Sequence, residues 1–315
     1  MKAIVMARFG GPDVLRWEER AEPRPRAHEL LVRVYATSVN TVDCSIRRGE
    51  QAVALPAVIG YDVSGVVEMV GTEVQDFVPG DEVFYMSEVF SSDGSYAEYH
   101  VAAETIVARK PPNLSHLEAA GIPLAAGAAW EALIGRAALR AGETVLILGA
   151  GDTGLFGIQI ARAAGAQVYV VCPPEAAALA LQLGATRTID LDEEDVVAVI
   201  QIESTDAAVE VVFDTVDGNS LRRIVQATKA HGRIASTVAA GPGLEDSLAR
   251  NITHHLVSVE PNRARLDLIR AMIQRGQIVP VIDSVLSLQD AAAAHRQLEV
   301  GRVLGKLVLC SVTTA

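Results

Sequence analysis

The hydrophobic positions divide the chain into a first part that predicts strands and a middle part that alternates between strands and helices. From residue 1 to 110, short β-branched or alternating runs are separated by Gly and Pro turn signals. The clearest of these runs are Lys2–Met6, Leu30–Ala36 and Val63–Val70. Short strands between turns predict a barrel-like β module. The next stretch, Leu114–Arg140, is rich in alanine and predicts helix, with Ser115 and Glu118 spaced as a capping box.

From Thr144 onward, short apolar runs alternate with helical patterns. The candidate strands are Thr144–Leu148, Gln167–Cys172, Arg187–Asp190, Val209–Asp214, Gly232–Thr237 and His255–Pro261. Strands that alternate with helices in this way predict an α/β fold with a doubly wound parallel sheet. The elements expected after them are a helix, a strand, a helix and a strand, at Arg263–Arg275, Val279–Ser287, Leu288–Val300 and Lys306–Cys310. We expect this β-rich tail to rejoin the first module.

Three glycines stand between the first strand of this region and the helix that follows it. Gly149, Gly151 and Gly154 have the spacing G-x-G-x-x-G, and the strand, turn, helix and next strand form a βαβ unit. Such glycines let the backbone approach a pyrophosphate, which the N-terminus of the helix then binds. We therefore expect a dinucleotide site here. The alternative is a structural glycine turn in another kind of α/β protein.

The residues around the glycines leave the choice of dinucleotide open. A carboxylate at Asp152 repels a pyrophosphate unless it turns to solvent or caps the helix. NAD-binding domains usually carry an acidic residue about 20 residues after the first glycine, whereas here the second strand ends at Val171-Cys172-Pro173-Pro174. The missing acid favours NADPH. No lysine or arginine stands nearby for its 2′-phosphate, however, so NADH remains an alternative.

Length, charge and cysteine content argue against several classes of protein. A chain of 315 residues indicates two domains, and a formal net charge of −12 disfavours nucleic acid and anionic membranes as partners. Three widely spaced cysteines argue against a disulfide framework and fit a reducing cytoplasm. The N-terminus predicts a strand rather than a signal peptide, and the longest apolar stretch is too short to span a bilayer. We therefore expect a cytoplasmic protein.

Several short segments, in a fixed order along nearly the whole chain, resemble those of one family. The segments are Ser38–Asp43 with Arg47 and Gly49, Gly60–Val67, Gly80–Phe84, Gly94–Tyr99, Leu183–Ala185, Phe213–Val216, Gly232–Arg233 and Gly305–Leu309. With the glycine motif, the chain resembles the medium-chain dehydrogenase/reductase superfamily, and within it the zinc-free quinone oxidoreductase group. Each segment alone is weakly specific, and their order carries the resemblance.

The resemblance implies a fold of two domains. A GroES-like, β-rich catalytic domain would contain residues 1–120 and 262–315. A Rossmann domain, with its doubly wound parallel sheet, would contain residues 121–261. The resemblance also implies a homodimer, often formed by pairing of the last Rossmann strand, here near His255–Pro261, with its copy in the partner.

The positions that carry zinc ligands in related dehydrogenases carry other residues here. The resemblance places Asn40, the pair Tyr61-Asp62 and Leu124 at those positions, and the cysteines of a structural zinc lobe are missing. A catalytic zinc needs three nitrogen, sulfur or oxygen ligands. These side chains do not supply them, and the seven histidines show no ligand spacing. We therefore predict that the protein holds no metal.

Without zinc, the resemblance implies transfer of hydride from NADPH to a quinone or an α,β-unsaturated carbonyl compound. Asn40 would hydrogen-bond a carbonyl oxygen or the nicotinamide carboxamide, Tyr61 would donate a proton or form a wall, and Asp43 would anchor the turn. The alternatives are a structural Asx turn for Asn40 and Asp43 and a core position for Tyr61. The implied cofactor contacts are Gly149, Gly151, Asp152, Thr153, Gly154, Cys172, Thr215, Val216, Thr237, Val238 and Lys306.

Four places in the cofactor region depart from the pattern of the family. They are Asp152-Thr153 in place of Gly-Val, Ala128 in place of threonine, Ala176 in place of a lysine that binds the 2′-phosphate, and Leu191 in place of an aromatic residue. Arg187 and Arg162 are the candidate cations to compensate. These departures motivate two further hypotheses, a non-catalytic member that serves as a binding or assembly module, and an NADH-using reductase.

Overall fold

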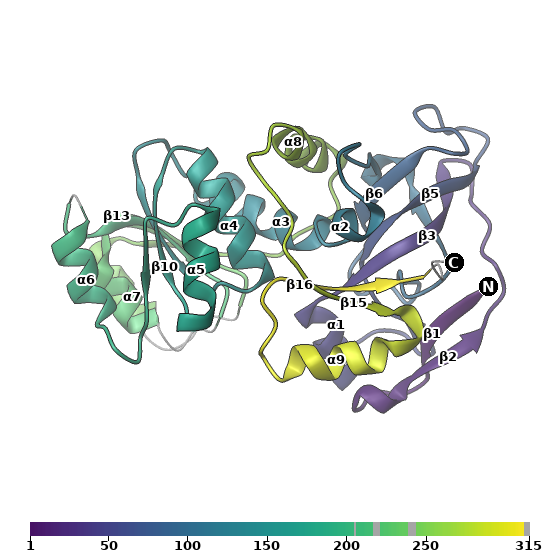
Figure 1. Cartoon of the computed structure of the whole chain (residues 1–315), viewed down its shortest axis with the longest axis horizontal. Helices are drawn as coiled ribbons and strands as arrows, with labels where there is room; N and C mark the ends of the chain where they lie inside the picture. Colours follow the sequence, from purple (N-terminus) through teal and green to yellow (C-terminus); the bar gives the residue numbers. More distant parts are fainter. Residues whose placement is uncertain (205, 217–220, 239–243, 312–315) are drawn as a thin grey trace. The chain divides into compact units, whose positions relative to one another are not determined.

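The computed structural model describes residues 1–204, 206–216, 221–238 and 244–311, and the chain folds as two compact units (Figure 1). The first unit combines both ends of the chain, Met1–Leu124 and Glu260–Ala315, and the second unit is Ala125–Val259. Within the described ranges, no helix is long and apolar enough to cross a membrane.

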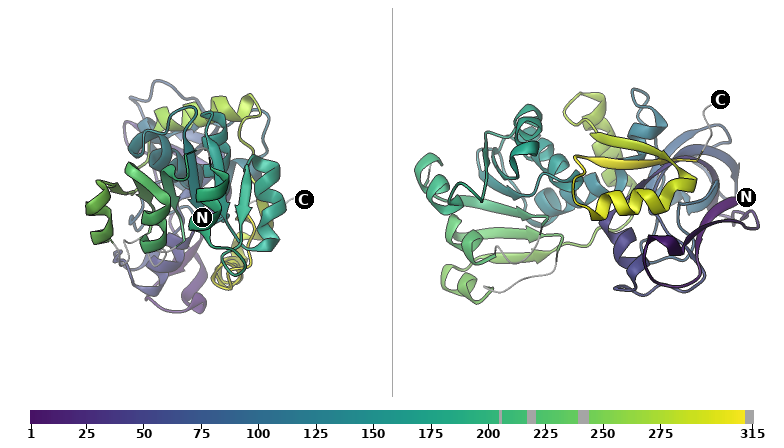
Figure 2. Two further views of the ribbon diagram at one scale, coloured as in Figure 1. Left: turned by 90° about the vertical axis from the view of Figure 1, so that its left-hand side faces the viewer. Right: turned by 60° about the horizontal axis from the view of Figure 1, so that its bottom comes forward.

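Two sheets build the first unit. The smaller sheet has the order β2 (Leu15–Glu19), β1 (Lys2–Met6) and β4 (Ala57–Val58). The larger sheet has the order β15 (Ile282–Ser287), β16 (Lys306–Cys310), β3 (Glu29–Val39), β5 (Asp62–Val70), β6 (Glu82–Met86) and β8 (Ala108–Arg109), and β7 (Tyr99–Ala103) also pairs with β3. The last strand of the chain therefore lies beside one of the first (Figure 2).

The helices of the first unit begin and end where local signals place them. They are α1 (Thr41–Arg48), α2 (His116–Ala120), α8 (Arg263–Gln274) and α9 (Ala291–Glu299), with short 3₁₀ turns η1 (Pro12–Val14), η2 (Glu104–Ile106) and η6 (Leu288–Asp290). The predicted capping box is confirmed, because the Ser115 N–H donates to Glu118 Oε2 at 2.8 Å and the Glu118 N–H donates to Ser115 Oγ at 3.3 Å. It opens α2.

The helix expected over Leu114–Arg140 is divided into three parts. After α2, the chain forms α3 (Pro123–Trp130) and then a π-helical segment, η3 (Glu131–Arg136). Gly121 ends α2, and Pro123, which cannot donate a backbone hydrogen bond, begins α3. The alanine-rich composition predicted helix correctly but did not show this interruption.

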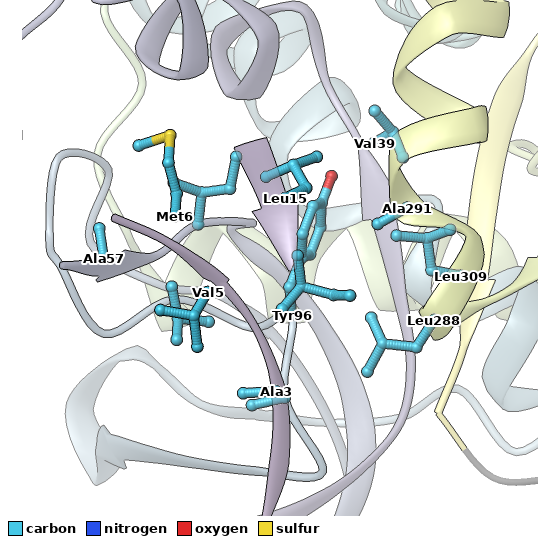
Figure 3. Close-up of a cluster of buried hydrophobic side chains, with 14 of the residues drawn as sticks. Ala3, Val5, Met6, Leu15, Val39, Ala57, Tyr96, Leu288, Ala291 and Leu309 are labelled. Carbon is cyan, nitrogen blue, oxygen red and sulfur yellow. The ribbon is translucent and has the colours of Figure 1, made fainter. Parts of the chain in front are cut away.

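The core of the first unit contains side chains from both ends of the chain (Figure 3). Its members include Ala3, Val5, Met6, Leu15, Val39, Tyr96, Leu288, Ala291 and Leu309. Burying one leucine side chain stabilises a fold by about 1.5–3 kcal/mol. Contacts of this kind join β1, β3 and β16 to the start of α9.

The second unit is a six-stranded parallel sheet with helices on both faces. Its order is β11 (Arg187–Ile189), β10 (Gln167–Val171), β9 (Thr144–Leu148), β12 (Val209–Asp214), β13 (Thr228–Ser236) and β14 (Thr253–Leu256). The helices are α4 (Asp152–Ala163), α5 (Pro174–Leu183), α6 (Val196–Glu203) and α7 (Leu221–Ala227), with the 3₁₀ segment η5 (Leu244–Arg250). This strand order confirms the predicted doubly wound sheet.

Two strands of this sheet differ from their predicted bounds by more than one residue. β13 begins at Thr228 rather than at Gly232, and β14 ends at Leu256 rather than at Pro261. The register explains the second difference, because β14 pairs with β13 only from Thr253 to Leu256, opposite Arg233 to Ser236. The carboxyl ends of β9, β12 and β13 nevertheless meet at one edge of the sheet, which positions the glycine loop.

Candidate active site

In the first unit, the ends of three strands bring together residues that are far apart in the sequence. Leu307 of β16 pairs with Val39 of β3, so the neighbouring Lys306 lies beside Asn40. Ala36 of β3 pairs with Ser64 of β5, and the antiparallel register then brings Asp62 near the far end of β3. These pairings surround the Asp62 carboxylate with polar groups.

The Asp62 carboxylate is fully buried and accepts three hydrogen bonds. Its Oδ2 accepts from Ser38 Oγ at 2.5 Å and from Asn40 Nδ2 at 2.9 Å, and its Oδ1 accepts from the Leu124 N–H at 2.7 Å. Leu124 is in the first turn of α3, where a negative charge is stabilising. Lys306 Nζ lies 3.8 Å from Asp62 Oδ2 and supplies the opposite charge. A fully buried carboxylate needs such a set of partners to offset its desolvation.

The side-chain amide of Asn40 is oriented from both ends. Its oxygen accepts from Lys306 Nζ, and its nitrogen donates to Asp62. An amide nitrogen carries two protons and an amide oxygen two lone pairs. The amide nitrogen therefore retains one proton for a further hydrogen bond to a ligand, whereas the oxygen side also takes part in the capping box of α1.

Asp43, in the first turn of α1, holds the main chain of Asn40. Its Oδ2 accepts from the Asn40 N–H at 2.8 Å and from the Tyr96 hydroxyl at 3.0 Å, whereas its buried Oδ1 has no hydrogen-bond partner. Burial raises the pKa of Asp43 to about 7, and the Asp62 charge adds to this. The Asn40 N–H, the Tyr96 hydroxyl and the Lys306 charge act in the opposite direction.

Tyr61 is fully buried in the hydrophobic cluster of the first unit. Its hydroxyl has no hydrogen-bond partner of normal geometry, although the nearby Phe90 backbone favours the ionised form. Burial raises the pKa of Tyr61 well above the usual range, and the Asp43 charge raises it further. These surroundings favour the core-aromatic interpretation of Tyr61 over that of a proton donor.

In the second unit, the glycine loop has the geometry that a pyrophosphate needs. Gly149 has a φ of +95°, and a Cβ on Gly154 would lie 2.0 Å from the Gly149 carbonyl oxygen, so only glycine lets α4 pack this closely on β9. A Cβ on Gly151 would meet nothing within 4 Å. The loop thus leaves open space in front of the first turn of α4.

The other expected cofactor residues of this unit lie at the same edge of the sheet. Thr215 Oγ1 donates to the Leu148 carbonyl oxygen at 2.7 Å, and both Thr215 and Val216 border Gly149. Thr237 N–H donates to the Asp214 carbonyl oxygen at 3.1 Å, and Val238 follows it. Cys172 follows directly after β10, the neighbour of β9.

Comparisons with known proteins agree with both units. The sequence profile of the alcohol dehydrogenase GroES-like domain matches residues 26–112, and that of the zinc-binding dehydrogenase matches residues 183–309. The quinone oxidoreductase of Mus musculus is 33% identical over 325 residues, covering 98% of this chain and 97% of that one. The chain belongs to the quinone oxidoreductase-like group of the medium-chain dehydrogenase/reductase superfamily. It is therefore an NAD(P)H-dependent oxidoreductase.

Solved structures of this superfamily have the same fold. The quinone oxidoreductase from Coxiella burnetii has a TM-score of 0.90 at 31% identity, with 99% of each chain covered. The quinone oxidoreductase of Escherichia coli, solved with NADPH, has a TM-score of 0.89 at 26% identity, covering 98% of this chain and 100% of that one. An NAD-dependent alcohol dehydrogenase reaches 0.93 at 31% identity, covering 99% and 100%.

The residues that the resemblance places at zinc positions do not fit a zinc ion. Asn40 and the Leu124 backbone both contact Asp62, whereas the Tyr61 side chain lies in the hydrophobic cluster. Asp62 is the one acidic ligand of this set, and the Lys306 ammonium already neutralises it. In the described part of the chain, no group of three His, Cys, Asp or Glu residues is placed to hold a metal.

The Asp152 carboxylate turns back onto its own helix. Its Oδ1 accepts from the Thr153 N–H at 2.7 Å and from Thr153 Oγ1 at 3.3 Å. The carboxylate therefore uses one of the N–H groups that would face a pyrophosphate, and its charge remains beside the space in front of Gly151. This is the helix-capping alternative that the sequence left open.

Arg187 and Arg162 are the candidate cations that could replace the missing lysine for a 2′-phosphate, and neither is placed to bind it. Arg187 forms ion pairs with Glu194 and with Glu203. Arg162 is in the last turn of α4 and packs against Gly184, and ten residues of helix separate it from Asp152, about 15 Å. Ala176 is buried near the start of α5 and adds no charge.

Sequence reasoning did not find the full partner set of this site. The cofactor contact of Lys306 stays a prediction, and the sequence does not show that its nitrogen bonds to Asn40 and lies near Asp62. Asp62 itself was considered only as a substitute for a zinc ligand. Its position directly after Tyr61, at the start of a strand, was the available signal, but its partners depend on the register of three strands.

We predict that Lys306→Met lowers the free energy of unfolding by about 3 to 5 kcal/mol, because it leaves Asp62 buried and uncompensated. The control is Lys2→Met, which removes a lysine that pairs with Glu19 at the surface, where a pair contributes about 0 to 1 kcal/mol. Denaturant unfolding measures both. Equal losses in the two variants would contradict the assigned role of Lys306.

We predict that Asp152→Asn strengthens NADPH binding roughly fivefold, about 1 kcal/mol, because it removes a negative charge beside the pyrophosphate and keeps the acceptor for Thr153. Calorimetric titration at low salt measures the change, and added salt should reduce it. Unchanged affinity would mean that the pyrophosphate binds away from this helix.

Proposed function

We propose that this protein is a zinc-independent reductase that transfers hydride from NADPH to a quinone or an α,β-unsaturated carbonyl compound. The observation that carries the proposal is the Asn40 amide, held by Lys306 and Asp62 at the position where zinc-dependent relatives carry a ligand. Relatives named quinone oxidoreductase, and an NADPH-dependent alkenal/one oxidoreductase of Arabidopsis thaliana at 32% identity, support the substrate class.

The chain provides positioning and electrostatics for this reaction. Bound NADPH supplies the hydride. The free amide proton of Asn40 hydrogen-bonds the carbonyl oxygen of the substrate and stabilises the negative charge that develops there. Lys306 donates to the other end of the same amide, which polarises it and strengthens this donor.

A second candidate function is the same reduction with NADH. The ion pairs of Arg187 and the distant position of Arg162 favour it, because a 2′-phosphate then gains no strong cationic contact from either. The solved relatives that contain NADPH favour the first candidate. A non-catalytic binding module, the other alternative from the sequence, is not supported by the family of the chain.

We also propose that the protein is a homodimer joined through β14. This strand is the edge of the six-stranded sheet, and Leu256 at its end is 66% exposed. An edge strand presents unpaired N–H and C=O groups that a second copy can pair with.

We expect NADPH oxidation to be fast with a quinone or an enone, unaffected by a chelator, and slower with NADH. In Asn40→Ala, kcat should fall roughly a hundredfold, the typical loss for one oxyanion donor. The control, Asn113→Ala, removes an exposed asparagine and should retain full activity. A faster rate with NADH would select the second candidate, and loss of activity with the chelator would refute zinc independence.

We expect sedimentation to show a dimer for the wild-type chain and a monomer for Leu256→Lys, because an exposed lysine at a strand edge opposes pairing. The matched control is Leu268→Lys in α8 of the first unit, where the leucine is 53% exposed. A wild-type monomer, or a Leu256→Lys dimer, would contradict the proposed interface.

A further inference from the structure

A chain of buried hydrogen bonds connects α9, near the end of the sequence, to the first turn of α1. His295 of α9 and Tyr96 are both fully buried. The Tyr96 hydroxyl lies 3.1 Å from His295 Nε2 and 3.0 Å from Asp43 Oδ2. Asp43 Oδ2 in turn accepts from the Asn40 N–H at 2.8 Å. The series of hydrogen bonds thus ends on the backbone N–H of Asn40, the residue whose side-chain amide carries the proposed function.

The direction of every hydrogen bond in this chain is determined by one arginine. Arg47 Nε donates to His295 Nδ1 at 3.3 Å, and an arginine side chain has no acceptor. His295 Nδ1 therefore carries the lone pair and Nε2 the proton, because burial and the charges of Arg47 and Arg48 lower the pKa of His295 to about 3 and keep it neutral. Nε2 donates to the Tyr96 oxygen, which leaves the single hydroxyl proton of Tyr96 for Asp43.

Arg47, where this series of hydrogen bonds begins, is itself held in place by several contacts. The Arg47 side chain is 1% exposed, and it also donates to the Gly10 carbonyl oxygen at 2.7 Å and to Glu299 of α9. The Cys44 thiol lies 3.4 Å from His295 Nδ1 and shares the same acceptor. Burial raises the pKa of Cys44 to about 12, so the thiol stays protonated and does not change the direction of these hydrogen bonds.

We propose that Tyr96 and His295 are positioning residues that hold the Asp43 carboxylate on the Asn40 N–H, and that this contact sets the lower pH limit of the reaction. The proposal rests on the function proposed for Asn40. Neither Tyr96 nor His295 contacts the substrate in the proposed reaction, and the sequence did not predict either residue as part of the site.

The pH dependence follows from the groups that face Asp43. Asn40 (through its N–H) and Cys44 face Asp43 from its own segment. The strands and loops packed against it contribute Tyr61, Asp62, Tyr96 and Lys306. Helix α9 contributes His295, which acts through Tyr96. The Tyr96 hydroxyl stabilises the carboxylate and lowers its pKa. Removing that hydroxyl therefore raises the pKa, so Asp43 takes up a proton at a higher pH and its hydrogen bond to Asn40 weakens there.

The test is an NMR titration that does not depend on activity. The chain has five asparagines, Asn40, Asn113, Asn219, Asn251 and Asn262, so protein labelled with ¹⁵N-asparagine gives few backbone amide signals. The Asn40 signal is assigned from its loss in Asn40→Asp. Its shift should follow the protonation of Asp43, and in Tyr96→Phe the midpoint should rise by about one pH unit. The lower pH limit of kcat should rise by the same amount.

The control is Tyr85→Phe, which removes another fully buried phenol hydroxyl from the same unit. Tyr85 bonds to His100 Nδ1 at 2.9 Å and has no contact with Asp43. We expect this variant to leave the midpoint of the Asn40 signal unchanged. Equal shifts in both variants, or an unmoved midpoint in Tyr96→Phe, would overturn the proposal.

The two readouts separate this proposal from the function on which it rests. If the Asn40 midpoint shifts only in Tyr96→Phe but neither dinucleotide supports turnover, the proposed function fails and the claim about the pH limit of the reaction fails with it, while the hydrogen-bond chain is supported. If turnover is normal and the midpoint does not move, the proposed function stands and the positioning role is refuted.

Discussion

The structure of the candidate site depends on one constraint, which is that a fully buried carboxylate must be paired. Asp62 meets it with Ser38, Asn40, the first turn of α3 and the Lys306 ammonium. These partners come from three segments, the end of β3, the start of α3 and the start of β16, so satisfying one charge fixes the ends of β3, β5 and β16 relative to one another. Removing any partner would leave a desolvated charge, which is far more costly than a missing surface contact.

The same contacts bear on the proposed zinc independence. At the positions where the resemblance to related dehydrogenases implies zinc ligands, this chain has an amide, a phenol and a main-chain N–H, and the positive charge comes from Lys306. In the proposed function, the site therefore offers a hydrogen-bond donor rather than a Lewis acid. Such a donor would suit a substrate that is already electrophilic, as quinones and enones are.

The carboxylates of the two units are held in different ways. In the first unit, Asp62 is held by Leu124 and Lys306 and Asp43 by Tyr96, groups that the fold brings from distant segments. In the second unit, Asp152 is satisfied by its neighbour Thr153, at the helix end that would otherwise face a phosphate. The glycines still give the loop the close packing of α4 on β9 that a dinucleotide site needs, so we expect local electrostatics at Asp152, rather than the shape of the loop, to limit cofactor affinity.

The sequence by itself determined those features that depend on neighbours within a few residues. Strands β1, β9, β12 and β16, the glycine loop and the capping box of α2 were all predicted, because alternation, β-branched runs and turn residues act locally. The order of short motifs also identified the family. Only the tertiary structure decided which groups pair with Asp62 and Asp43. Lys306 is 266 residues from Asn40 and His295 is 199 residues from Tyr96, and strand register and helix packing, which no local pattern encodes, bring them together.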